Sequence, residues 1–275
     1  MDVIEIIKDA FVFPSKDIKI LVIYVLLSVL AGAFSFIGTF VYILGVIIPE
    51  CFMWGGMAVI VSMLIGWILS GYLISVIKSG IELDDKVPGF EWWDNFITGF
   101  NNFIVTIVYF IIPAFIVAVV GYITNVFGNF MIIAREIISL AQNVYMGHST
   151  VLVSDAMAHA FANLVVSLAV TFTVAIVLFV IFSFLQTMAQ ARLANTGSLS
   201  EALNVFEAVK DIARIGVSKV IIIVLLIIVI VAVVEMILST FISFSPVLSI
   251  LSIIVTPYMT FFAQRAVGLL YSDIA

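Results

Sequence analysis

Residues 189–220 read AQARLANTGSLSEALNVFEAVKDIARIGVSKV, and this stretch decides how the rest of the chain is organised. It opens on the charged end of one apolar segment and closes where the next apolar segment begins. Between the two, Ser198 and Glu201 have the Ser-x-x-Glu spacing of a capping box, which predicts a helix start. Apolar residues then recur at helical spacing, at Leu199, Ala202, Phe206, Val209, Ile212 and Ile215. The pattern predicts an amphipathic helix at a membrane boundary that leads directly into a membrane span.

The composition is typical of a membrane protein. Of the 275 residues, 64% are hydrophobic and 10% are charged, whereas soluble domains carry about 25% charged residues. A helix needs about 20 apolar residues to cross a hydrocarbon core of about 30 Å. Windows of this length without Asp, Glu, Lys or Arg are residues 20–48, 51–77, 103–134, 156–191 and 236–264. The sequence lacks the period of 2 that marks a membrane β-barrel, so we predict an all-α integral membrane fold in which residues 1–275 form one domain.

We expect six transmembrane helices that pair as three hairpins. The expected spans cover residues 20–43, 55–77, 103–123, 161–188, 220–241 and 247–264. Each hairpin is expected to follow an amphipathic helix at the water–lipid boundary. The first of these helices lies within residues 1–19, the second begins near Glu91 and carries Trp92 and Trp93, and the third lies within 198–219. The start MDVIEIIKDAF has Asp2 and Glu5 where a signal peptide would be basic, so no cleavable signal is expected.

Short similarities suggest that one unit occurs three times, over residues 1–78, 79–192 and 193–275. Phe90-Glu91 and Phe206-Glu207 stand at the same distance from the next span, and Phe13-Pro14 takes the same place before the first. The second unit is longer because of an expected outer insertion over residues 124–160, which contains a helix near 130–144. The alternative is that any boundary helix in front of a span has this appearance.

Basic residues predict the orientation. In the three-hairpin arrangement, ten of the eleven Lys and Arg residues lie on the side of the two termini, and only Arg135 lies opposite. Because cytoplasmic loops are rich in Lys and Arg, we expect a multi-pass protein of the cell membrane with both termini in the cytoplasm.

The chain resembles an archaeal family of polytopic membrane proteins of unknown function, the domain of unknown function 4013. The stretches that carry the resemblance are residues 9–14 (DAFVFP), 71–78 (GYLISVIK), 83–85 (LDD) with Pro88 and Phe90, and 191–194 (ARLA) with Gly197 and Phe206. Trp92-Trp93-Asp94 departs from the acidic-then-Trp order that we associate with the family. The resemblance implies a membrane location and an archaeal source, and it implies no catalytic or binding residues.

One group of residues could ligate a metal. Asp155 and His159 are four residues apart and share a helical face, and His148 and Glu136 lie nearby in the sequence. Carboxylate and imidazole groups together suit a divalent transition metal. The alternative is a polar outer loop that happens to hold both histidines, and we expect no bound cofactor.

Four further polar residues lie within or at the ends of spans. Glu235 follows Val220 by 15 residues, or about 22 Å of helix, which places it near the outer boundary of the core; it could carry a proton or an ion. Gln186 and Gln190 are four residues apart, and Gln264 is the counterpart of Gln190. These glutamines could bind a substrate, or they could form hydrogen bonds between helices.

The remaining features favour a protein that is not an enzyme. The sequence contains no phosphate loop, nucleotide-binding glycine pattern, nucleophile elbow or zinc-protease helix, and Cys51 is the single cysteine. The net charge of -6 argues against a nucleic-acid partner. We predict a membrane scaffold or lipid-associated subunit, with membrane lipids and either a second copy or another protein as partners. A small-molecule or ion transporter is the main alternative, and a lipid-modifying enzyme is the third.

Overall fold

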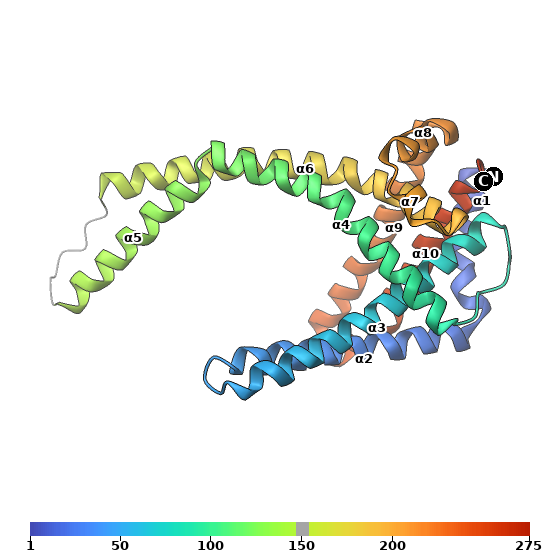
Figure 1. Cartoon of the computed structure of the whole chain (residues 1–275), viewed down its shortest axis with the longest axis horizontal. Helices are drawn as coiled ribbons and strands as arrows, with labels where there is room; N and C mark the ends of the chain where they lie inside the picture. Colours follow the sequence, from blue (N-terminus) through green and yellow to red (C-terminus); the bar gives the residue numbers. More distant parts are fainter. Residues whose placement is uncertain (147–153) are drawn as a thin grey trace. The chain divides into compact units, whose positions relative to one another are not determined.

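The computed structural model describes residues 1–146 and 154–275, and within these residues the fold is helical, with no strand (Figure 1). The helices of this part of the chain are α1 (Val3–Val12), α2 (Ile18–Leu44), α3 (Glu50–Ile81), α4 (Trp92–Ile123), α5 (Val126–Tyr145), α6 (Asp155–Thr196), α7 (Leu199–Ala202), α8 (Val205–Ile215), α9 (Val217–Phe244) and α10 (Ile250–Tyr271). Short 3₁₀ turns, η1 (Phe13–Lys16) and η2 (Pro246–Ser249), precede α2 and α10.

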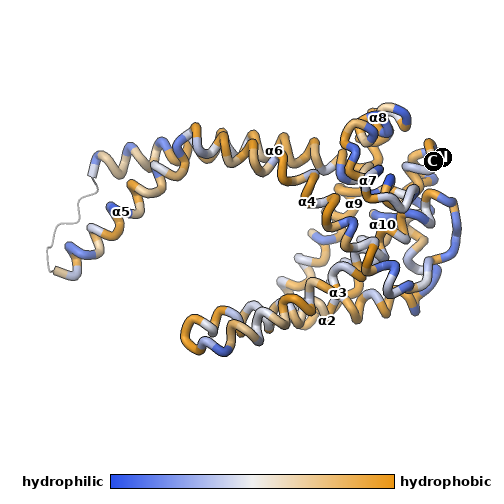
Figure 2. The backbone as a smooth tube through the Cα atoms, viewed as in Figure 1, coloured by the Kyte–Doolittle hydropathy of each residue, from blue (hydrophilic) through white to orange (hydrophobic). Residues whose placement is uncertain are grey.

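Six helical segments among the described residues are long and apolar enough to cross a membrane. They are α2, α3, α4, α6, α9 and the segment Val247–Tyr271 that contains α10. Figure 2 shows hydrophobic residues around α2 and α9, and side chains such as Phe36 and Ile228 are largely exposed. Exposed apolar side chains on helices of this length suit a lipid solvent. The prediction of an all-helical, multi-pass membrane protein is confirmed at this level.

The chain forms two compact units. Unit 1 consists of Met1–Thr106 and Leu185–Ala275, and unit 2 consists of Ile107–Phe184, so α4 and α6 each contribute residues to both. In unit 1, α2 packs along α3, α3 packs against α10, and α1 packs against α10. Aromatic rings form much of its core: Tyr24 contacts Tyr72 and Phe261, with ring centroids 5.9 and 4.9 Å apart.

Glycine pairs allow helices of unit 1 to cross closely. A Cβ atom at Gly71 of α3 would overlap the backbone carbonyl of Asn95, and one at Gly99 of α4 would overlap that of Trp67. Gly80 and Gly268 make a similar crossing of α3 with α10. Small residues at such positions let backbones approach without the hydrophobic driving force that operates in water.

Unit 2 has its own interhelical contacts. The Ser167 hydroxyl donates to the backbone carbonyl of Thr124 (2.5 Å), and the hydroxyls of Thr124 and Thr171 lie 3.3 Å apart. The rings of Phe110 and Phe179 stack at 5.6 Å. The segment expected to be an insertion is more helical than the sequence suggested, because α5 is longer than the expected helix at 130–144 and α6 already begins at Asp155.

Two expected boundaries differ in the structure. The helix expected near Glu91 is not separate from the third span, because α4 runs without a break from Trp92 to Ile123. Gly99 and Pro113 lie inside this helix without ending it, and the change from an amphipathic to an apolar pattern does not end it either. Conversely, the helix expected within 198–219 is split: Ser198 caps α7, and the Asn204 side chain caps α8 by accepting from the Glu207 amide (3.2 Å).

The crossing of α3 and α4 can be tested with one methyl group. Gly99→Ala should lower the free energy of unfolding in detergent by about 1–3 kcal/mol, because the added methyl overlaps a backbone carbonyl. Gly66→Ala is the matched control, since a Cβ atom at Gly66 meets nothing within 4 Å and alanine is the better helix former. Thermal unfolding of both variants measures the difference, and equal midpoints would contradict the close crossing.

Candidate functional site

Both chain termini lie at one end of unit 1, which we call the terminal face (Figure 1). The N-terminal ammonium of Met1 pairs with Asp273 at 3.1 Å, and Lys219 at the start of α9 also pairs with Asp273. Burial would raise the pKa of Asp273, but hydrogen bonds from Lys219 and the N-terminus lower it below its usual value. The two ends of the chain are therefore joined through charge.

A first buried cluster at the terminal face is centred on Arg192 of α6, which is 8% exposed. Its guanidinium donates to Asp211 of α8 (2.8 Å) and to the carboxylate of Glu201 in α7 (2.7 Å). Asp211, itself 1% exposed, also accepts from the Tyr271 hydroxyl of α10 (2.8 Å). We call this group the Arg192 cluster, and it fastens α7 and α8 to the ends of two membrane-spanning segments.

A second cluster is centred on Arg265 of α10, which is 1% exposed. The guanidinium donates to Asp9 of α1 (2.9 Å) and to the backbone carbonyl of Asp84 after α3 (2.7 Å). It also stacks over the Phe13 ring, 4.4 Å from the centroid. Lys16 completes this Arg265 cluster by pairing with Asp85 at 2.9 Å, and it fastens α1 to α10.

Sequence reasoning missed both clusters. Arg192 and Arg265 follow the ends of two expected spans and entered the sequence analysis only in the count of basic residues, but both guanidiniums are buried among carboxylates. The signal available was the recurrence of Ala-Gln before each arginine, at residues 189–192 and 263–265. Counting basic residues assigns a side of the membrane, but it does not identify which carboxylate each base meets.

Helix α8 has three distinct sides. Ala208, Asp211 and Ile215 are buried against the rest of unit 1. A second side carries Phe206, which is 82% exposed, and Val209. The third side carries the ion pairs of Glu207 with Lys210 (2.6 Å) and with Arg214 (3.8 Å). Helix α1 repeats this division, with Ile6 and Ala10 buried, Ile4 and Phe11 exposed, and Glu5 and Lys8 on the remaining side.

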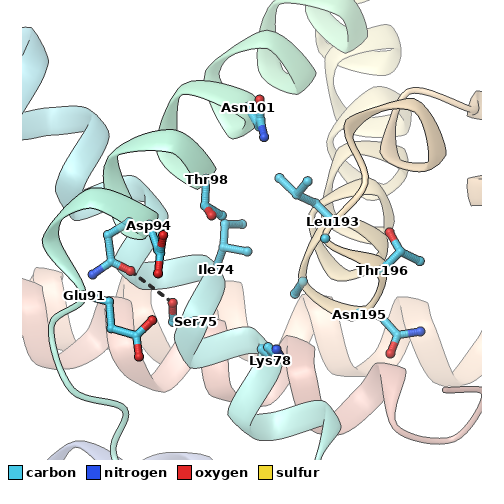
Figure 3. Close-up of a pocket in the computed structure, with 13 residues that line it drawn as sticks. Ile74, Ser75, Lys78, Glu91, Asp94, Thr98, Asn101, Leu193, Asn195 and Thr196 are labelled. Carbon is cyan, nitrogen blue, oxygen red and sulfur yellow. Dashed lines mark hydrogen bonds between the residues drawn. The ribbon is translucent and has the colours of Figure 1, made fainter.

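A polar cleft of about 360 Å³ opens between α3, the first turns of α4 and the C-terminal end of α6 (Figure 3). Its walls are formed by Ile74, Ser75, Lys78, Glu91, Asp94, Asn95, Thr98, Asn101 and residues 193–197. An adjoining cavity of about 340 Å³ shares Ser75, Lys78 and Glu91 and continues toward Glu82 and Lys86. Polar side chains line more of this cleft than of the cavities beside Tyr24 and beside Ala169.

The acidic residues of the cleft differ from those of the two arginine clusters. Within the described residues, the Glu91 and Asp94 carboxylates make neither an ion pair nor a side-chain hydrogen bond. Of the described residues that line the cleft, Lys78 alone is a cation; its Nζ lies 3.9 Å from Glu82 and its side chain is largely exposed. Asn95 is 2% exposed; its Oδ1 lies 3.2 Å from the Ser75 hydroxyl, while its Nδ2 has no partner among the described residues.

Two of the predicted polar residues, Gln186 and Gln190, join a ladder of hydrogen bonds that starts two helical turns beyond Asn95. The Gln190 amide donates to Asn102 (3.1 Å), and Asn102 donates to the Ser70 hydroxyl (2.8 Å). One turn further along α4, Gln186 donates to Thr106 (2.9 Å). The ladder links α3, α4 and α6 inside their apolar segments.

The other predicted site residues lie elsewhere. Glu235 of α9 is half-buried and accepts from the Thr256 hydroxyl of α10 (3.0 Å). Gln264 does not take part in the ladder, and its Oε1 has no partner in the described part of the chain.

The metal candidates are only partly within the described residues. Asp155 and His159 are exposed on α6, Glu136 is half-buried on α5, and His148 lies outside the described residues. Among residues 1–146 and 154–275, no group of three His, Cys, Asp or Glu side chains is placed to hold a metal ion.

The chain was compared with known protein families, curated proteins and solved structures. One family model, described as "Protein of unknown function (DUF4013)", matches residues 54–244. The chain belongs to this family. Neither the curated proteins nor the solved structures give a match. The family expected from the sequence is thus confirmed, while the archaeal source stays a prediction. Of the stretches that carried the resemblance, residues 9–14, 83–85 and 191–194 contribute to the two arginine clusters.

The Arg192 cluster should contribute strongly to stability. Arg192→Met leaves the Asp211 carboxylate buried without its main partner, which should lower the free energy of unfolding by about 3–5 kcal/mol. Lys210→Met is the control, because exposed ion pairs contribute about 0–1 kcal/mol. Replacing both partners, in Arg192→Met with Asp211→Leu, should restore much of the loss. Unfolding in detergent measures all three, and equal effects of the two single variants would contradict the buried pair.

The Arg265 cluster should weaken in acid. The hydrogen bond and charge of Lys16 hold the pKa of Asp85 below its usual value of 3.8. A carboxylate with a lowered pKa stabilises the fold above its unfolded pKa, and the contribution is lost as the pH falls through the folded value. Wild type should therefore unfold at a higher temperature than Asp85→Asn at pH 7, and the difference should shrink as the pH falls below about 4 and disappear below the lowered pKa of Asp85 in the folded protein. A difference that persisted unchanged at pH 3 would contradict this assignment.

Proposed function

We propose that this protein is a non-enzymatic membrane scaffold or lipid-associated subunit that holds amphipathic helices at the inner surface of the cell membrane. In this proposal the terminal face is cytoplasmic, in line with the excess of Lys and Arg near the termini. The helices that meet the lipid surface are α1 and α8, and membrane lipids are their partners.

The observation that carries the proposal is the three-sided character of α8. A helix on the surface of a soluble protein has two sides, one toward the core and one toward water. Helix α8 instead buries Asp211, exposes Phe206 and Val209, and places Lys210 and Arg214 on a separate side. Such a helix suits a position where protein, lipid and water meet. The apolar side would enter the boundary between headgroups and acyl chains, as amphipathic helices do.

The arginine clusters support the same reading. They attach α1 and α8 to the ends of membrane-spanning segments through buried, charge-assisted hydrogen bonds, which are stronger than neutral ones. A helix fixed in this way keeps a constant depth and rotation relative to the spans. Exposed tryptophans, Trp92 and Trp93, begin α4 a few residues after Asp84, whose carbonyl belongs to the Arg265 cluster, and tryptophan is enriched at headgroup depth.

A second candidate function, transport of a small molecule or ion, is favoured by one observation. The polar cleft is followed along α4 by the ladder that joins Asn102 to Gln190 and Thr106 to Gln186. Polar side chains that continue from a cleft into the apolar segments could form part of a solute pathway. The ladder equally supplies hydrogen bonds that hold α4 and α6 together, and for this reason we rank transport second.

Spin labels can test the lipid contact of α8. In a Cys51→Ser background, a label at Val209→Cys, on the side that carries Phe206, should collide with oxygen, which concentrates in lipid. A label at Lys210→Cys, the next residue of the same helix, should collide with a water-soluble nickel complex. Because adjacent residues of an α-helix point to different sides, the two labels differ in side but scarcely in position along α8, and each controls for the other. The measurement uses the full chain reconstituted in lipid vesicles.

Two results would contradict the proposal. Equal nickel accessibility at both labels would show that the Phe206 side faces water. Solute-specific flux into vesicles that contain the protein, abolished by Asn102→Leu, would establish transport in place of the scaffold function.

A further inference from the structure

The first turns of α4 can be compared with α8 residue by residue. Phe90-Glu91 and Phe206-Glu207 were aligned from the sequence, and this register pairs Asn95 with Asp211. Both residues are buried, and in both helices the side chain meets the C-terminal part of a membrane-spanning helix. The exposed apolar side is also shared, with Trp93 at the position of Val209.

Two features of α8 are missing from α4. Where Asp211 receives the Arg192 guanidinium, Asn95 meets only the Ser75 hydroxyl and retains an amide nitrogen without a partner among the described residues. Where α8 carries Lys210, α4 carries Asp94. The charged side of α8 is therefore neutralised by its own ion pairs, whereas in α4 the same side presents two carboxylates and no cation.

The cleft lies on this unneutralised side of α4. Glu91 and Asp94 form part of its wall, and the C-terminal end of α6 forms the facing wall (Figure 3). Helix α6 ends at Thr196 and is followed by Gly197, whose φ of 66° is left-handed and whose amide donates to the Leu193 carbonyl at 2.9 Å. The C-terminal end of a helix carries a partial negative charge. The C-terminal end of α6 and the carboxylates of Glu91 and Asp94 therefore both favour a bound cation.

The size and the remaining charge of the cleft restrict the ligand. A volume of about 360 Å³ lies within the range of small-molecule sites and greatly exceeds that of a bare ion. The described residues around it offer no group of three metal-ligating side chains. Lys78 on α3 adds one positive group that can pair with an anion. The site thus offers both signs of charge on different elements.

We propose that the cleft binds a small zwitterionic ligand that carries an ammonium group and a phosphate group. The ammonium lies between Glu91 and Asp94, in the place that Lys210 takes on α8, and the phosphate pairs with Lys78. Thr98 and Asn101 provide neutral hydrogen-bonding groups on the same wall. This chemistry has two sources, a phosphoethanolamine lipid headgroup or a free phosphoethanolamine-like solute. The proposal does not depend on the lipid contact of α8.

Titration of the full-length protein in detergent with O-phosphoethanolamine tests the site. Binding should be measurable by calorimetry, and Glu91→Gln combined with Asp94→Asn should raise Kd at least tenfold. Inorganic phosphate and ethanolamine should bind more weakly, because each carries only one of the two charged groups. Glu207→Gln is the matched control, because Glu207 takes the place of Glu91 on α8 and lies outside the cleft. Unchanged circular dichroism shows that the variants fold.

A second measurement separates the two sources. Native mass spectrometry of protein extracted from mixed phosphatidylethanolamine and phosphatidylglycerol vesicles reports which lipid is retained. Preferential retention of phosphatidylethanolamine, lost in the double variant, identifies a lipid headgroup. Binding of O-phosphoethanolamine without that preference identifies a soluble ligand. The proposal is overturned if neither O-phosphoethanolamine nor phosphatidylethanolamine binds, or if inorganic phosphate binds as tightly as O-phosphoethanolamine. It is also overturned if Glu207→Gln weakens binding as much as the double variant does.

Discussion

The burial of two guanidinium groups is the constraint on which the terminal face depends. A charge removed from water is costly unless it is paired and hydrogen-bonded, so Arg192 and Arg265 can be buried only if carboxylates reach them. Those carboxylates come from segments that the spans do not contain: Asp211 lies in α8, and Asp9 lies at the start of the chain. Satisfying the two arginines therefore fixes where α1 and α8 attach. It also makes the ends of a chain of 275 residues adjacent.

The same three-sided helical pattern occurs in α1, in α8 and in the first turns of α4. Helices α1 and α8 divide their surface among protein, an exposed apolar side and a charged side, and the charges of α8 balance one another. The first turns of α4 keep the division but change two residue types, with asparagine at the buried position and aspartate at the position of the lysine. Among the described residues, Glu91 and Asp94 lack an ion pair, and this distinguishes the cleft from the closed contacts around Arg192 and Arg265.

Much of the fold could be predicted from the sequence, because apolar length reports directly on membrane spans. The cap at Ser198 could also be predicted, because the Ser-x-x-Glu spacing involves only residues that are close in the sequence. Partners distant in sequence could not be predicted: nothing near Arg265 indicates that Asp9, 256 residues away, will accept its hydrogen bond. The continuity of α4 was missed because amphipathic and apolar patterns are both helical. Glu91 was interpreted only as the start of a boundary helix, because the lack of an ion pair to Glu91 and Asp94 among the described residues depends on what α3 and α6 place opposite them.

The length of α6 has a consequence for how the protein sits in lipid. At 1.5 Å per residue its 42 residues extend for about 63 Å, roughly twice the thickness of a hydrocarbon core. Even a tilt of about 40°, the upper end of the observed range, leaves about 48 Å along the bilayer normal. Helix α6 therefore has more residues than one crossing of the hydrocarbon core can use.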